Sequence, residues 1–91
     1  MNIMTDVVAV SLRGHDKGGI FVVIGFADEN HALIADGKIR KREKPKKKKL
    51  KHLMAIGRLE LPEPSSASNR ELRHALRKFC AAVAAVAEGG I

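Results

Sequence analysis

The run IFVVIGF, from Ile20 to Phe26, is the strongest strand signal in the chain. It is continuously apolar, too long for an exposed edge strand and too short to favour a helix. Gly25, near its end, is the kind of residue that marks a bulge or a sharp bend within a strand. We therefore expect a β domain organised around this segment.

Shorter apolar runs lie on either side of it. Residues 7–10 (VVAV) fit a strand that is buried on both faces or forms a tight barrel wall. Residues 31–35 (HALIA) follow a turn signal at Asp28–Asn30 and are predicted to return beside the central run. Between the first two strands, residues 12–19 contain three glycines, which predicts positive φ values and close approach of the backbone to a neighbour.

The sequence from residue 36 to residue 56 is less regular. Asp36-Gly37 favours a two-residue turn, and a further strand is then expected to begin at Lys38 and to point Ile39 inward. Residues 43–49 are predicted to form a loop, because they contain a proline and four successive lysines that repel one another. Residues 50–56 (LKHLMAI) fit either a closing strand or a helical turn.

About five short strands with tight turns favour a mainly β fold that closes into a small barrel, since closure removes exposed strand edges. We assign residues 1–58 to this barrel, with a basic loop at 38–52. Its core is expected to consist of Val8, Val10, Ile20, Val22, Ile24, Leu33 and Ile39.

The tail is predicted to form a separate helix. Residues 59–68, rich in proline and serine, are expected to form a linker, and Ser68 with Glu71 fits a capping box. A helix should occupy most of residues 69–91 and end at Gly89-Gly90. We expect its apolar face to dock on the barrel of the same chain, with dimerisation as the alternative. Its arginines are expected to be solvated, with contact to phosphate as the alternative. That face carries Leu72, Leu76, Phe79, Val83 and Val86.

The positive charge is concentrated in one segment. Residues 38–51 carry ten of the seventeen Lys and Arg residues and one acid, Glu43, and so have a charge of +9. The rest of the chain holds seven bases and nine acids, a charge of −2, which gives the total of +7. Such a concentration favours a polyanionic partner, because each neutralised phosphate releases counterions. A solvated basic run or a localisation signal is the alternative.

Several other classes of protein are disfavoured. With three Phe and no Trp or Tyr, contacts to nucleic-acid backbone and shape are favoured over base stacking. The one cysteine excludes an internal disulfide, the four histidines lack metal-ligand spacing, and the glycines lack a phosphate-loop pattern. No nucleophile with a base is evident, so we predict no enzyme, cofactor or metal. No signal peptide or membrane-spanning run is recognised, which predicts a cytoplasmic protein.

A resemblance to a known family covers residues 6–54. Its first part resembles the KOW motif, and the continuation to Asp36-Gly37 is similar to the archaeal and eukaryotic large-subunit ribosomal protein family L-fourteen-e. With the lysine run included, the segment most resembles short bacterial KOW domain-containing RNA-binding proteins. Asp6 departs from the family, which usually has a glycine before the first strand. The residues that carry the resemblance are Asp6-Val7-Val8, Gly14, Asp16-Lys17-Gly18, Phe21–Ile24, Asp28-Glu29-Asn30, Asp36-Gly37, Lys44–Lys49 and Lys51-His52-Leu53.

The resemblance implies an SH3-like barrel that binds ribosomal or other structured RNA, with the large ribosomal subunit as a partner and a role in translation. A membrane partner and a small-molecule substrate are not expected, and a monomer is favoured over a dimer through the terminal helix. A transcription- or DNA-associated KOW module and a protein-interaction adaptor are the alternatives. Charge and resemblance together predict these RNA-binding residues: Arg13, Gly14, His15, Lys17, Gly18, Lys38, Arg40, Lys41, Arg42, Lys44, Lys46, Lys47, Lys48, Lys49, Lys51 and His52.

Overall fold

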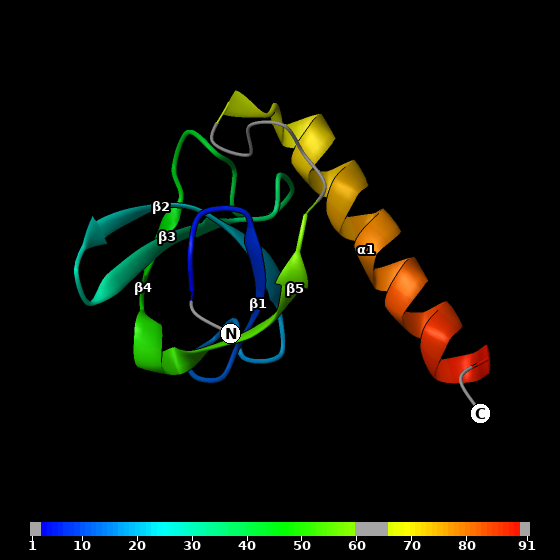
Figure 1. Ribbon diagram of the computed structural model, residues 1–91. Coiled ribbons are helices and arrows are strands. Elements are labelled where there is room, and N and C mark those ends of the chain that lie inside the picture. Colours follow the sequence, from blue (N-terminus) through cyan, green and yellow to red (C-terminus); the bar gives the residue numbers. More distant parts are fainter. Residues whose placement is uncertain (1–2, 60–65, 90–91) are drawn as a thin grey trace.

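Five short strands and one long helix make up the computed structural model, which describes residues 3–59 and 66–89, with side chains up to residue 84 (Figure 1). The barrel comes first and the helix follows it, as the sequence predicted. The elements in chain order are β1 (Val7–Ser11), β2 (Ile20–Asp28), β3 (His31–Ala35), β4 (Lys46–Lys49), the 3₁₀ turn η1 (Leu50–His52), β5 (Leu53–Arg58) and α1 (Asn69–Gly89).

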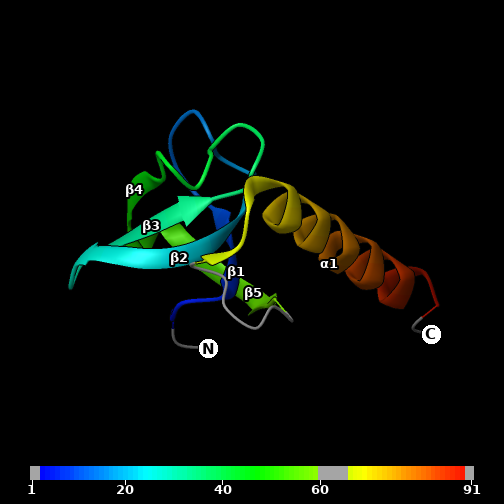
Figure 2. The same ribbon diagram turned by 90° about the horizontal axis from the view of Figure 1, so that it is seen from above.

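All strand pairs are antiparallel, in the order β4-β3-β2-β1-β5. The two outermost strands, β4 and β5, are joined by the single turn η1, so the sheet curls round until its edges lie near each other (Figures 1 and 2). This arrangement is a small SH3-like barrel. The mainly β fold class with a C-terminal helix is therefore confirmed.

The first three predicted strands are confirmed, and each is as long as expected or slightly longer. The bulge expected near Gly25 is also present, because the pairing of β2 with β3 shifts register between Val23 and Gly25. Residues 50–56, for which two alternatives were open, contain both: one helical turn at 50–52 and then strand β5.

The strand predicted from Lys38 is wrong. Residues 36–45 form a loop, in which one carboxylate oxygen of Asp36 accepts hydrogen bonds from the backbone amides of Lys38 and Arg40 at 2.9 and 2.8 Å. These amides are therefore turned toward a side chain instead of a neighbouring strand. Ile39, expected inside the core, is 77% exposed.

The loop predicted for residues 43–49 is also partly wrong, since the four lysines form strand β4. Their side chains alternate between the two faces of the sheet, which separates neighbouring charges. Lys46 and Lys48 pair across from Ile34 and Ala32, whose side chains are fully buried, so these two lysines face the inside of the barrel. Repulsion between the lysines was the reason to predict a loop. It is relieved by this alternation and by Asp16, which forms ion pairs with Lys46 and Lys48.

The core consists of two apolar layers, one on each face of the sheet. One layer fills the inside of the barrel and consists of Ala9, Phe21, Val23, Ala32, Ile34 and Leu53. The other lies between the sheet and α1 and consists of Val8, Val22, Ala35, Leu59, Ala67, Leu72 and Leu76, with Ile20 and Ile24 packed against it. Most residues predicted for the barrel core thus lie under the helix instead. The continuous apolar run of β2 follows from this burial on both faces.

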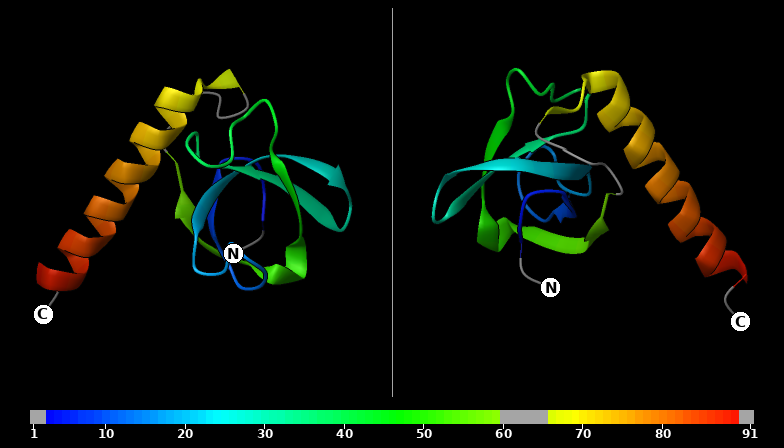
Figure 3. Two further views of the ribbon diagram at one scale, coloured as in Figure 1. Left: turned by 180° about the vertical axis from the view of Figure 1, so that it is seen from behind. Right: turned by 45° about the horizontal axis from the view of Figure 1, so that its top comes forward.

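Helix α1 begins with the predicted capping box. The Ser68 hydroxyl accepts a hydrogen bond from the Glu71 amide at 3.1 Å, and the Glu71 carboxylate accepts one from the Ser68 amide at 3.2 Å. Leu72 and Leu76 are buried on the barrel of the same chain, which confirms the favoured docking. The helix then extends beyond the barrel, so that Val83 is 51% exposed (Figure 3).

Two parts of the predicted tail fall outside the description. Residues 60–65 of the predicted linker are not described, and of Val86 only the backbone is. Within the described parts of the chain, no helix has the length and apolar character needed to cross a membrane.

Candidate nucleic-acid interface

The basic segment is divided between the two ends of the barrel (Figure 1). Residues 36–45 lie at the end where α1 begins, and the Arg42 amide donates a 2.7 Å hydrogen bond to the Asn69 side chain there. Residues 46–52 lead to the opposite end, where the Leu12 amide donates to the His52 carbonyl at 2.8 Å. We call these the helix end and the glycine-loop end. The expected contact between the basic segment and residues 12–19 therefore involves only its second half.

At the glycine-loop end, a network around Asp16 ties the loop to β4. One carboxylate oxygen of Asp16 lies 2.8 Å from both the Ser11 hydroxyl, which donates to it, and the Lys48 ammonium. The other oxygen lies 3.0 Å from the Lys46 ammonium. Lys48 also donates to the Arg13 carbonyl at 2.5 Å. The inward-facing lysines of β4 thus hold the glycine loop against the end of the barrel.

This network keeps Asp16 ionised. Burial alone would raise the pKa of Asp16, but the hydrogen bond from Lys48, the Lys46 ammonium and the hydrogen bond from Ser11 hold that pKa far below its ordinary value. The Lys48 side chain is only 7% exposed. Two of the predicted RNA-binding lysines are therefore engaged within the fold, and Lys48 has little surface left for a phosphate.

The other two lysines of β4 face outward. Lys47 and Lys49 are exposed, and Lys47 lies 3.9 Å from the Asp28 carboxylate. Asp28 also contacts the His31 ring at 2.8 Å, and this contact is the main reason why the pKa of Asp28 is lowered. Lys49 therefore offers its charge to solvent more fully than Lys47 does.

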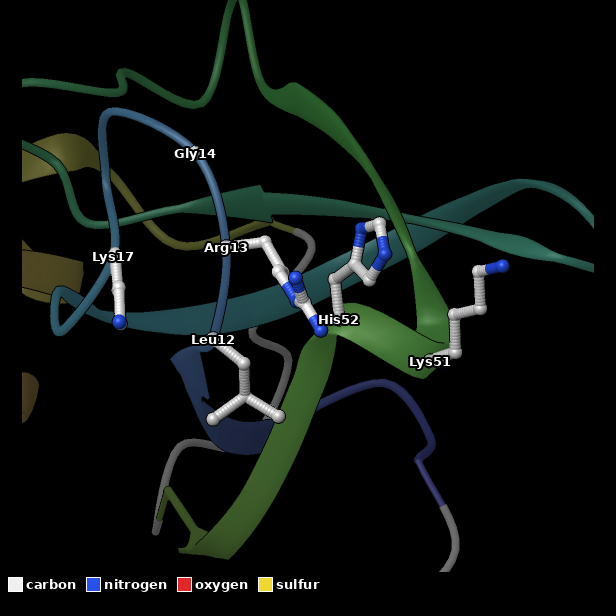
Figure 4. A pocket seen from close by; sticks show the side chains of 6 residues that line it. All are labelled: Leu12, Arg13, Gly14, Lys17, Lys51 and His52. Carbon is white, nitrogen blue, oxygen red and sulfur yellow. The ribbon is translucent and has the colours of Figure 1, made fainter.

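An open hollow of about 680 Å³ lies beside the glycine loop (Figure 4). Figure 4 shows the side chains of Arg13 and His52 next to each other, with Lys17 and Lys51 on either side of them. Among the described residues, no carboxylate lines this hollow. The residues that line it are Leu12, Arg13, Gly14, Lys17, Lys51 and His52.

Positive φ values were predicted for the three glycines of this loop, and two of the three have them. Gly14 and Gly18 have φ values of 87° and 86°, in the left-handed region that favours glycine. A Cβ on Gly14 would lie 3.2 Å from the Lys48 ammonium, so the loop also passes close to β4. His15, at the tip of the loop, is exposed. The main chain is therefore accessible beside the cations.

The charges in this region act on His52. Burial is the main reason why the pKa of His52 is lowered from its ordinary value of 6.5, and the neighbouring cations add to the effect. Those cations are Lys51, Lys49, Arg13 and Lys48. The His52 imidazole thus lies among cations beside the glycine loop.

At the helix end, two acids shape the loop. Asp36 binds backbone amides, as described above, and the Glu43 carboxylate accepts hydrogen bonds from the Asn69 side-chain amide at 2.8 and 3.1 Å. These bonds to Asn69 are the main cause of the lowered pKa of Glu43. Of the predicted binding residues here, Lys38, Lys41 and Lys44 are exposed, and Arg40 and Arg42 are half-buried.

Sequence reasoning missed the residues that hold this surface together, chiefly Asp16, Ser11 and Asn69. Asp16 belongs to the segment that resembles the KOW motif, and Asn69 lies at the predicted start of the helix. A single acid within a basic loop was the available signal for Asp16, but its lysine partners lie about thirty positions farther along the chain, at Lys46 and Lys48. Nothing in the spacing connects them.

No family model matches the chain, and no curated protein matches it either. Across residues 3–59 and 66–89, no group of three or more His, Cys, Asp and Glu side chains could hold a metal ion. The arrangement of cations, glycine backbone and a hollow without acids is suited to contacting a phosphate backbone.

Proposed function

We propose that this is a non-catalytic, cytoplasmic RNA-binding protein that contacts ribosomal or other structured RNA, with the large ribosomal subunit as its partner. The observation that carries this proposal is the hollow at the glycine-loop end. Its lining combines three cations and an imidazole with accessible glycine backbone and no acid among the described residues. Phosphate groups are the ligands that such a lining fits.

The residues of the hollow would act in different ways. Arg13 presents a planar guanidinium that can donate two parallel hydrogen bonds to one phosphate. Lys17 and Lys51 act as point charges that position the RNA strand. Gly14 lacks a Cβ, which would lie 3.2 Å from the Lys48 ammonium, so the loop that carries Arg13 can pass close to β4.

Readout of RNA shape is favoured over base stacking. Of the three phenylalanines, Phe21 is buried and Phe79 is half-buried against the barrel, so only Phe26 is well exposed, at 42%. A binder of single strands would ordinarily present several aromatic platforms. Structured RNA, contacted through phosphates and 2′-hydroxyls, is the better fit to this surface.

The backbone at Asp6 supports the resemblance to the KOW family. Asp6 stands where the family usually has a glycine, and its φ of 75° is a left-handed value that favours glycine. The strained conformation is held by Arg58, which donates two hydrogen bonds to the Asp6 carboxylate at 2.9 and 3.0 Å. Asp6 thus adopts a backbone conformation for which the family's glycine would be suited.

The proposal is tested by measuring affinity for an RNA hairpin and for a DNA duplex of equal sequence over a series of salt concentrations. We expect a preference for RNA, and a slope of log affinity against log salt that becomes shallower by roughly 0.7 to 0.9 in the Arg13→Gln variant. Lys78→Gln, which removes the same charge from α1, is the control and should leave the slope unchanged. Equal affinity for DNA would favour the DNA-associated alternative, and equal slopes for both variants would overturn the proposed site.

One observation favours a second candidate, an adaptor that pairs through α1. Val83 continues the face of Leu72 and Leu76 along α1 and is half-exposed. If two chains pair there, the melting temperature should rise with protein concentration, and Val83→Asp should abolish the rise. A melting temperature that is independent of concentration would argue against the adaptor.

A further inference from the structure

On the basis of the proposed function, we infer that one RNA contacts both ends of the barrel and that Arg70 and Arg73 of α1 belong to the second contact. The cations of this second contact come from the loop at 36–45 and from the first two turns of α1. We call them the helix-end patch, and they are Lys38, Arg40, Lys41, Lys44, Arg70 and Arg73.

The loop and the helix are in direct contact. Gly37 has a φ of 78° and packs so closely that a Cβ there would overlap the Asn69 carbonyl and lie 3.1 Å from the Arg73 amide. Asn69 then binds both the Arg42 amide and the Glu43 carboxylate. The start of α1 and the basic loop therefore form one surface, although 27 positions separate Arg42 from Asn69 in the sequence.

Arg70 and Arg73 of α1 lie next to this contact and away from the buried face of the helix. Leu72 and Leu76 mark the buried face of the helix, and Arg73 follows Leu72 by one residue, which turns it by about 100°. Arg70 lies three residues before Arg73 and so shares its side of the helix. Both arginines are exposed.

The acids of this region do not cancel its charge. Together with Arg42, the patch has seven cations against three acids, which leaves a net charge of +4. Each of the acids binds backbone or amide donors: Asp36 binds two loop amides, Glu43 binds Asn69, and Glu71 binds the Ser68 amide. They maintain the shape of the loop and the helix.

Helix stability does not explain the two arginines. The beginning of a helix carries the positive end of its dipole, so cations there are less favourable than acids. Glu71 is the acid that the first turn of α1 uses for this purpose. The helix dipole therefore does not favour Arg70 and Arg73 at these positions, whereas a bound polyanion would.

Strand β4 connects the two contacts. It runs from the loop at the helix end to η1 at the glycine-loop end, and its outward-facing residues are Lys47 and Lys49 (Figures 1 and 3). A phosphate backbone lying along β4 would thus meet Lys47 and Lys49, and would displace Asp28, which lies 3.9 Å from Lys47. The two smaller dimensions of the molecule are 26 and 23 Å, so an RNA stem must be about that long to reach both ends.

The experiment compares the full-length protein and its variants on two RNA hairpins, with stems of about four and about twelve base pairs, and uses the salt slope as the readout. For the unchanged protein we expect a clearly steeper slope on the long stem, since only that stem reaches both ends. On the long stem, Arg73→Gln should reduce the slope by roughly 0.7 to 0.9 and Arg70→Gln with Arg73→Gln by about twice as much. Lys78→Gln is the matched control, because Lys78 lines the other side of α1 with Arg58 and Leu59.

The outcomes separate this inference from the proposed function. If Arg13→Gln reduces the slope and the α1 variants do not, the helix-end patch is not a contact and the proposed function stands. If the protein without substitutions shows the same salt slope on both stems, one RNA does not contact both ends of the barrel. If the unchanged protein binds neither RNA, the proposed function and this inference both fail. Thermal melting of each variant verifies that the fold is intact, as expected for exposed arginines.

Discussion

The ammonium of Lys48 lies 2.8 Å from the carboxylate of Asp16, at the end of the barrel that the glycine loop closes. Side-chain exposure is 7% for Lys48 and 10% for Asp16, so the pair is shielded from solvent. It links a loop near the start of the chain to the lysine run near its middle. The surface proposed to bind RNA therefore depends on a lysine that contributes to folding.

Replacing Lys48 with Met should destabilise the protein by about 2 to 4 kcal/mol, because it leaves the buried charge of Asp16 with fewer partners. Urea denaturation measures this change in the free energy of unfolding. Lys47→Met, one position away and facing outward, is the control and should change stability by less than about 0.5 kcal/mol. Equal midpoints for the two variants would show that the Asp16 contact contributes nothing to the fold.

Stability should decrease in acid because of Asp16. Its pKa is lowered in the folded protein, so the unfolded chain takes up the proton first, and the contribution of Asp16 is fully present above its ordinary value of 3.8. It is lost as the pH falls from 3.8 toward the folded pKa. Denaturation midpoints measured between about pH 5 and pH 2 should therefore fall less steeply for Asp16→Asn than for the unchanged protein. Parallel curves would contradict this assignment.

RNA binding should raise the pKa of His52. In the free protein, burial and four neighbouring cations keep this pKa below 6.5, and phosphates bound in the hollow would offset those positive charges. By linkage, affinity should then increase as the pH falls through the interval between the free and bound pKa values. NMR titration of the imidazole with and without the RNA hairpin measures both values. His52→Gln should remove this part of the pH dependence, and a pKa that RNA leaves unchanged would place the phosphates elsewhere.

Gly57 and Phe79 should behave as a coupled pair. A Cβ on Gly57 would lie 2.5 Å from the Phe79 ring, so Gly57→Ala must displace the ring and should cost about 1 to 3 kcal/mol. Phe79→Ala alone should cost about 3 kcal/mol, as expected for a large side chain packed on the barrel. The double variant should lose less than the sum, since the small side chain makes room for the new methyl group. Strict additivity of the unfolding free energies would show that the ring does not pack on Gly57.

Much of the fold was predictable because its signals are local. The apolar runs gave three strands within two residues of their observed ends, and Ser68 with Glu71 placed the start of α1. The prediction failed where a contact distant in sequence decides the structure. The four adjacent lysines form a strand that pairs with β3, and two of them form ion pairs with Asp16. Likewise, periodicity alone could not distinguish the face of β2 inside the barrel from the face beneath α1, because both are apolar.

The candidate site was predictable as a set of cations but not as a surface. From charge alone, residues 38–51 were predicted to form one binding segment. In the structure, the two halves of this segment lie at opposite ends of the barrel. Which lysines face inward depends on the register of β4 against β3, with Ala32 opposite Lys48. That register is fixed by the buried residues of β3, and the lysine run itself contains no information about it.

The placement of the lysine run in strand β4 has a consequence for the thermodynamics of binding. A disordered basic tail loses backbone conformational entropy when it engages a polyanion, about 1 to 2 kcal/mol for each residue that becomes ordered. For the four residues of β4, this loss has already occurred when the barrel folds. The two lysines that face outward, Lys47 and Lys49, would therefore meet the proposed RNA at a fixed separation. Binding to this strand should consequently show little of the heat-capacity change that accompanies coupled folding.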